Sequence, residues 1–140
     1  MANALYPLWK QNLLAGTAGQ DLDNDTAVDG PFCALIDEAI YTYSPAHQFY
    51  NSIPPAAIIN TDQRITAPTI LNGTFDGNNL IYISVIGPSI EALIVYRHNA
   101  GPNTTWPLIM FYDQPGGGLP LTPNGGNITV TWNSGGIFTL

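Results

Sequence analysis

Four aspartates near the N-terminus come closer to a metal-binding pattern than any other residues of the chain. Thr26 stands at the sixth position of the corresponding calcium loop, where glycine makes the turn, and Phe32 at the twelfth, where a bidentate glutamate is needed. We therefore interpret the segment as a solvated acidic loop, with calcium as the ion expected if a metal binds. The aspartates occupy the first, third, fifth and ninth loop positions: Asp21, Asp23, Asp25 and Asp29.

The other side chains with catalytic potential are scattered. His47 and His98 lie far apart and in no metal-ligand spacing, so we expect both to pack at a surface or interface. Glu91 lies in an expected strand, but a glycosidase needs a second carboxyl group at a defined separation, and the sequence indicates none. Cys33 stands in an apolar run and is expected to pack as a small hydrophobic residue. The sequence predicts no catalytic residue, no cofactor and no enzymatic activity.

Aromatic side chains in the expected loops form a second group that could bind a ligand. They stand beside Asn, Asp and Gln residues, a mixture that binds sugars by ring stacking and hydrogen bonding. Trp and Tyr are also enriched at the centres of protein interfaces, so composition leaves both interpretations open. In a chain so poor in charge we favour the interface. The residues are Tyr41, Tyr43, Phe49, Tyr50, Trp106 and Tyr112.

The shortage of charge is the main clue to partners. Only 9% of the 140 residues are charged and 45% are hydrophobic, whereas a soluble domain usually has about 25% charged residues. We therefore expect much of the surface to contact other protein. The net charge of -7 repels phosphate and excludes direct nucleic-acid binding. No apolar run is long enough to span a membrane, and the N-terminus lacks the pattern of a secretion signal, so we expect synthesis in the cytoplasm.

Short apolar runs between Gly, Pro and Asn residues indicate one mainly β domain, residues 1–140. We expect an antiparallel β-sandwich or barrel, of jelly-roll or immunoglobulin-like size, with one short N-terminal helix. The helix is expected over residues 3–15, with Pro7 in its first turn. The parts of the domain are a helical segment, 1–16, an acidic loop, 17–30, and a β body, 31–140.

Turn residues separate the expected strands. Asn72-Gly73 and Asp76-Gly77 supply the positive φ angles of tight hairpins. Segment 44–55, with three prolines and two aromatic residues, favours an ordered loop packed on the body. We favour a strand at 38–43, and a short helix from Asp37 is the alternative. Strands are expected at 32–37, 38–43, 56–60, 69–71, 74–75, 80–86, 90–96, 108–112, 128–132 and 137–140.

Two expected strands, 80–86 and 108–112, are apolar on both faces. An antiparallel strand in a small sandwich usually has one solvated face, so another layer or another subunit must cover the second. Since the helix is the only extra layer expected, we favour a subunit, and we expect Ile83 and Ile109 to point outward. The candidate interface residues are Leu8, Trp9, Ile81, Ile83, Trp106, Ile109 and Phe111.

Three segments are similar to small virion structural proteins of tailed bacteriophages. They are MANALY at 1–6, the stretch from NGTFDGNNL at 72–80 to EALIVY at 91–96, and GLPLTPNGGNITVTW at 118–132. These segments are strand and turn motifs and identify no catalytic residue. Residues 17–68 match less well, and related chains have more lysine in the N-terminal helix.

The resemblance implies a protein present in repeated copies on the capsid exterior of a virion. There a cement or decoration protein bridges neighbouring capsomers and stabilises the shell. The expected partners are the major capsid protein and copies of the chain itself, in a homo-oligomer such as a trimer. A neck, tail or adsorption component is the alternative within the virion. A carbohydrate-binding module that uses the loop aromatics is the alternative from another class.

Overall fold

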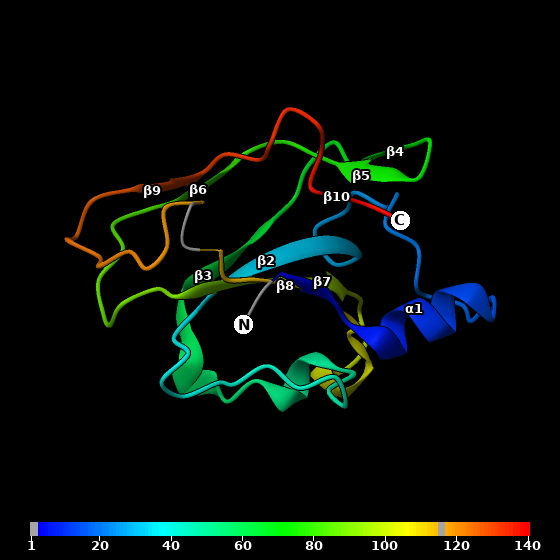
Figure 1. The fold of residues 1–140 in the computed structure, drawn as a ribbon, viewed down its shortest axis with the longest axis horizontal. Coiled ribbons are helices and arrows are strands. Elements are labelled where there is room, and N and C mark those ends of the chain that lie inside the picture. Colours follow the sequence, from blue (N-terminus) through cyan, green and yellow to red (C-terminus); the bar gives the residue numbers. More distant parts are fainter. Residues whose placement is uncertain (1–2, 115–116) are drawn as a thin grey trace.

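A computed structural model describes residues 3–114 and 117–140. Residues 1–2 of the expected helical segment and 115–116 of the expected β body lie outside this range. The fold is mainly β, with antiparallel sheets in a small sandwich-like arrangement and one short helix, which confirms the expected fold class (Figure 1). The strands are β1 Ala4–Leu5, β2 Gly30–Ile36, β3 Ile58–Arg64, β4 Thr69–Leu71, β5 Thr74–Asp76, β6 Leu80–Tyr82, β7 Ala92–His98, β8 Leu108–Tyr112, β9 Ile128–Val130 and β10 Phe138–Thr139. The α-helix, α1, spans Pro7–Leu14, and 3-10 turns span Tyr50–Ser52, Pro55–Ala57 and Asn103–Thr105.

The largest sheet has the strand order β1-β8-β7-β2-β3, with every pair antiparallel. β2 and β7 lie at its centre and pair over their whole length, from Gly30 opposite His98 to Ile36 opposite Ala92. Nearly all residues of these two strands are buried. Strands that are apolar on both faces need cover on both, and the rest of the chain supplies two different covers.

One face of this sheet is covered by the small sheets β6-β9 and β10-β5-β4 (Figure 1). Tyr82 of β6 is fully buried, and its hydroxyl donates a hydrogen bond of 2.6 Å to the carbonyl oxygen of Cys33 on β2. In β9, Ile128 and Val130 are half-buried and Thr129 is exposed, which confirms the expected alternation.

Segment 37–57 covers the opposite face (Figure 1). The ring of Phe111 on β8 lies 5.3 Å from that of Tyr43 and 6.5 Å from that of Tyr41. The backbone amide of Leu108 donates to the carbonyl oxygen of Gln48 at 2.9 Å. The ordered loop expected within this segment is confirmed. It also supplies the layer that we expected from a neighbouring subunit.

Several expected elements have different bounds. The helix begins at Pro7, not at residue 3, because Ala4–Leu5 pairs with β8 as β1. Neither the strand nor the helix expected near 38–43 forms. Instead, the carbonyl oxygen of Asp37 accepts hydrogen bonds from the amides of Ile40 and Tyr41, and its carboxylate accepts one from Ala39. Aspartate that binds nearby amides in this way competes with regular structure and makes a turn.

The two glycine turns also differ. Asn72-Gly73 joins β4 and β5 with both φ angles positive, as the two-residue hairpin requires. Asp76-Gly77 instead leads from β5 in one sheet to β6 in another, so the hairpin expected there is wrong. The strand expected at 80–86 ends at Tyr82, because Ser84 takes a positive φ of 50° that a strand does not tolerate.

Within the described chain, no helix has the length and hydropathy needed to cross a membrane.

Candidate functional site

Three of the four aspartates of the expected acidic loop, Asp21, Asp25 and Asp29, form ion pairs with arginines. The Arg97 side chain, only 6% exposed, places Nη1 2.9 Å from Asp29 Oδ1 and Nη2 3.5 Å from Asp21 Oδ1. Its Nε donates to the Asp21 carbonyl oxygen at 2.6 Å. Arg64 lies 3.5 Å from Asp25. Residues 3–114 and 117–140 contain no group of three or more His, Cys, Asp or Glu that could hold a metal ion. The geometry is that of an acidic loop fastened to the sheet by two arginines, and it offers no support for the calcium candidate.

The scattered titratable groups have structural partners. His47 Nδ1 is joined to the hydroxyl of Tyr41 at 2.8 Å, and burial lowers the pKa of this histidine. His98 Nδ1 donates to the carbonyl oxygen of Val28 at 2.9 Å. Glu91 accepts a hydrogen bond of 2.7 Å from the amide of Glu38, which fixes the turn after β2. Cys33 is fully buried, and burial raises the pKa of its thiol to about 12, so it packs as the small hydrophobic residue expected.

Aromatic rings gather in a shallow hollow of about 340 Å³ where segment 37–57 meets β3 and the end of β7. The rings of Tyr50 and Tyr96 lie 4.4 Å apart, and that of Trp106 is stacked on Tyr96 at 5.9 Å and 15°. The ring of His98 also lies against that of Trp106, with 4.0 Å between the ring centroids. We call this the aromatic hollow; its lining residues are Phe32, Tyr50, Ile58, Asn60, Thr61, Asp62, Tyr96, His98 and Trp106.

Asp62 of β3 is the charged residue of the aromatic hollow. Its Oδ2 accepts hydrogen bonds from the hydroxyls of Tyr50 at 2.6 Å and Tyr96 at 2.9 Å. Its Oδ1 is buried and accepts no hydrogen bond from any described residue. Burial raises the pKa of this carboxyl group, while the two tyrosine hydrogen bonds act in the opposite direction. In the sequence, Asp62 lies in a polar stretch and gives no sign of this environment.

The six aromatic residues expected in loops lie in different parts of the structure. Only Tyr50 and Trp106 enter the aromatic hollow. Tyr41 and Tyr43 contact Phe111 in the core. The other two do not reach the hollow: Phe49 forms a bridge with Pro107, and Tyr112 lines a cavity between the two layers. A single ligand site built from all six is therefore excluded.

The candidate interface residues differ in their burial. Trp9, Ile109 and Phe111 are buried within the chain, so the outward direction expected for Ile109 is wrong. Segment 37–57 encloses β8, and Trp9 packs edge-on against Phe138 at 5.8 Å, so these residues belong to the core. Leu8 and Trp106 are half-buried. The remaining two candidates, on and just after β6, are exposed: Ile81 and Ile83.

Three isoleucines form an exposed row that we call the isoleucine ridge: Ile81, Ile83 and Ile86, with 53%, 59% and 74% of each residue exposed. Between them, Tyr82 and Val85 are fully buried, whereas Ser84 is exposed. The backbone under the ridge is held by hydrogen bonds. Asn60 donates its amide to the Ile83 carbonyl oxygen at 3.1 Å, and Val85 exchanges two backbone hydrogen bonds with Gly125 and Gly126. The ridge is thus an ordered apolar surface.

The molecule therefore offers two surfaces of different chemistry: a polar, aromatic hollow with one buried carboxylate, and an uncharged apolar ridge. Neither brings together a nucleophile, a general base and an oxyanion donor among the described residues. No protein-family model matches the chain, and no curated protein is similar to it at a significant level.

Proposed function

We propose that the protein is a structural subunit of a bacteriophage virion, of the capsid cement or decoration type, that binds the shell and its own copies through the isoleucine ridge. The observation that carries the proposal is the exposure of three neighbouring isoleucines on an ordered backbone. An apolar row of this kind is stabilised when a partner covers it, because burial removes it from water.

The distribution of charge supports the same surface. The chain carries no charged side chain between Asp76 and Glu91, or anywhere after Asp113. These stretches include β6 and β9 and the isoleucine ridge. Copies with a net charge of -7 repel one another. Contact through an uncharged layer meets the least repulsion, which favours this layer over the acidic loop for self-association.

Counting the chain in purified virus particles tests the proposal. Quantitative mass spectrometry of particles from a host that carries the gene should find it at a copy number comparable to that of the major capsid protein. A small multiple of the particle symmetry instead supports a neck or tail location. Absence from intact particles overturns the virion assignment.

The aromatic hollow favours a second function, the binding of a saccharide. Its rings offer stacking surfaces, and the exposed Asn60 and Thr61 at its edge offer an amide and a hydroxyl for sugar hydroxyls. A glycan array should then show binding that is lost in Trp106→Ala. The matched control is Tyr112→Ala, which removes a half-buried ring outside the hollow. Silence of the wild-type protein across the array overturns this function.

A further inference from the structure

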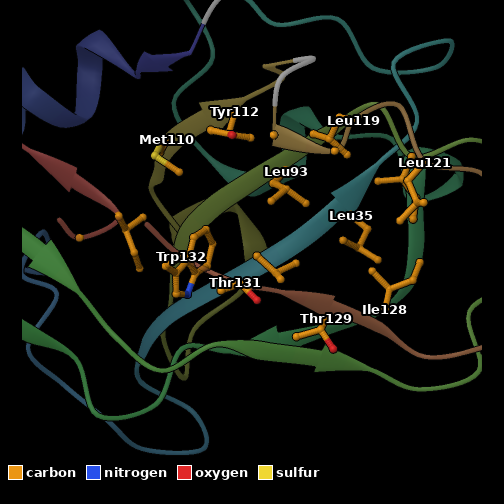
Figure 2. Close-up of a pocket in the computed structure, with 16 residues that line it drawn as sticks. Leu35, Leu93, Met110, Tyr112, Leu119, Leu121, Ile128, Thr129, Thr131 and Trp132 are labelled. Atoms are coloured by element: carbon orange, nitrogen blue, oxygen red, sulfur yellow. The ribbon is translucent and has the colours of Figure 1, made fainter. Parts of the chain in front are cut away.

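The two layers of the sandwich do not close on each other completely. A cavity of about 360 Å³ lies between the face of the main sheet and β9 with the residues that follow it. Figure 2 shows Leu35 and Leu93 from the main sheet on one wall and Ile128, Thr129 and Trp132 on the other. We call it the interlayer cavity. Its lining residues are Leu35, Ile90, Leu93, Met110, Tyr112, Gly117, Gly118, Leu119, Leu121, Ile128, Thr129, Val130, Thr131, Trp132, Gly136 and Ile137.

Both walls of the interlayer cavity are fixed by hydrogen bonds. Leu35 and Leu93 are directly opposed in the central β2–β7 pair. Across the cavity, β9 pairs with β6, and the backbone amide and indole Nε1 of Trp132 donate to Asn79 Oδ1 at 2.9 Å and the Asn78 carbonyl oxygen at 3.0 Å. At one end, Ile90 and Leu121 exchange two backbone hydrogen bonds of 2.8 Å.

These hydrogen bonds fix the backbone of each wall. Protein interiors are close-packed and rarely leave voids much larger than a water molecule. An apolar cavity of about 150 Å³ stays dry and binds benzene. A cavity about twice as large, between two hydrogen-bonded walls, has the properties of a preformed binding site.

The lining defines the ligand. Among the described residues that line the cavity, none carries a charge and none is histidine. An ion would be buried there without a partner, which is strongly unfavourable. The indole ring of Trp132 and the thioether of Met110 favour an aromatic ligand. The hydroxyl of Tyr112 is the polar side-chain group that faces the ligand, because Thr129 and Thr131 are exposed on the opposite side of the strand from Ile128 and Val130.

We propose that the interlayer cavity binds a neutral molecule built on one or two aromatic rings. The ligand enters between the layers, with its rings against Leu93, Met110 and Trp132 and a hydroxyl or amino substituent toward the hydroxyl of Tyr112. This site lies apart from the isoleucine ridge and the aromatic hollow. It does not depend on assembly or on saccharide binding.

Titration with 1-aminonaphthalene, a neutral two-ring fluorophore, tests the proposal on the whole chain. The wild-type protein should give a saturable rise in probe fluorescence with quenching of tryptophan emission. Val130→Phe places a larger side chain in the cavity and should weaken binding about tenfold or more. The matched control, Leu71→Ser, removes an exposed apolar side chain of β4 and should leave the titration unchanged.

A second measurement keeps the test decisive if Val130→Phe fails to fold. In wild-type protein labelled at methionine methyl groups, the Met110 resonance should shift with the same midpoint as the fluorescence. Absence of saturable binding up to the solubility of the probe overturns the proposal, as does an unshifted Met110 resonance at saturation. Binding that is lost in Ile83→Ser but kept in Val130→Phe places the probe on the isoleucine ridge and also overturns it.

Discussion

The two covers of the main sheet differ in kind. Segment 37–57 has no regular strand, yet it closes over β8 so completely that Ile109 and Phe111 are fully buried. The layer of β6 and β9 is made of paired strands, yet it leaves a cavity beneath it and an apolar ridge above it. Regular hydrogen bonding therefore does not by itself complete a core. The irregular segment packs its aromatic side chains against the sheet, whereas the paired strands β6 and β9 leave part of the sheet uncovered.

The comparison also locates the shortage of charge. The acidic loop is paired with Arg64 at the end of β3 and with Arg97 near the end of β7. The stretches that contribute β6 and β9 contain no charged side chain. All charged side chains thus lie outside this layer, although the rest of the chain also carries fewer of them than a soluble domain usually does. A partner is expected on that layer alone, whereas the strand pattern predicts one on 80–86 and on β8.

The largest expected effect contrasts one isoleucine from each cover. Ile109→Asp buries a carboxylate without a partner and should destabilise the fold by more than about 4 kcal/mol, leaving little folded protein. Ile83→Asp changes an exposed side chain and should alter the free energy of unfolding by less than about 0.5 kcal/mol while weakening self-association. Urea unfolding and sedimentation velocity measure the two effects. A folded Ile109→Asp, or an unfolded Ile83→Asp, would break the distinction between the two covers.

The next effect concerns the arginine that fastens the acidic loop. Arg97→Met removes two ion pairs and a hydrogen bond from a buried position and should cost about 2 kcal/mol. Arg64→Met removes one partly exposed pair and should cost less than about 1 kcal/mol. Hydrogen exchange should then show faster amide exchange around Asp21 and Asp29 in the first variant. Equal losses of stability in the two variants would mean that the burial of Arg97 does not strengthen its contacts with the acidic loop.

The sequence predicts the regular part of this fold well and the irregular part poorly. The apolar runs of β2, β7 and β8 and the Asn72-Gly73 turn are local signals, and each leads to the element expected. The cover of β8 by Tyr41 and Tyr43 could not be predicted, because an irregular segment has no periodicity that shows which face it packs on. The sequence therefore predicts a neighbouring subunit over β8, whereas segment 37–57 of the same chain covers it.

The candidate surfaces also differ in how far the sequence predicts them. The sequence predicts that one face of the apolar run 80–86 lies outside the core, and the exposure of Ile81 beside the buried Tyr82 agrees with the period of two along a strand. The aromatic hollow joins Tyr50, Asp62 and Trp106 from distant segments. Their proximity depends on the order of strands in the sheet, and no local pattern encodes that order. The shared environment of these residues becomes visible only in three dimensions.

The smallest expected effect is a dependence on pH confined to the side of segment 37–57. Burial raises the pKa of Asp62 in the folded chain above that of about 3.9 in the unfolded chain, so the folded state binds more protons between these two values. The free energy of unfolding should therefore fall as pH rises through this window and level off above it.

Asp62→Asn removes this titration and isolates its contribution. The amide oxygen of the variant still accepts from Tyr50 and Tyr96, so the hydrogen bonds of Oδ2 are kept while the charge is lost. Chemical denaturation of both proteins from pH 3 to pH 8 should give curves whose difference grows in favour of the variant as pH rises. Tyr82→Phe is the matched control, because it removes a buried hydroxyl from the uncharged layer and should shift stability by about 1 kcal/mol equally at every pH. A constant difference for Asp62→Asn would show that the carboxylate is as well solvated in the folded chain as in the unfolded one, and the two sides of the sheet would then respond to pH alike.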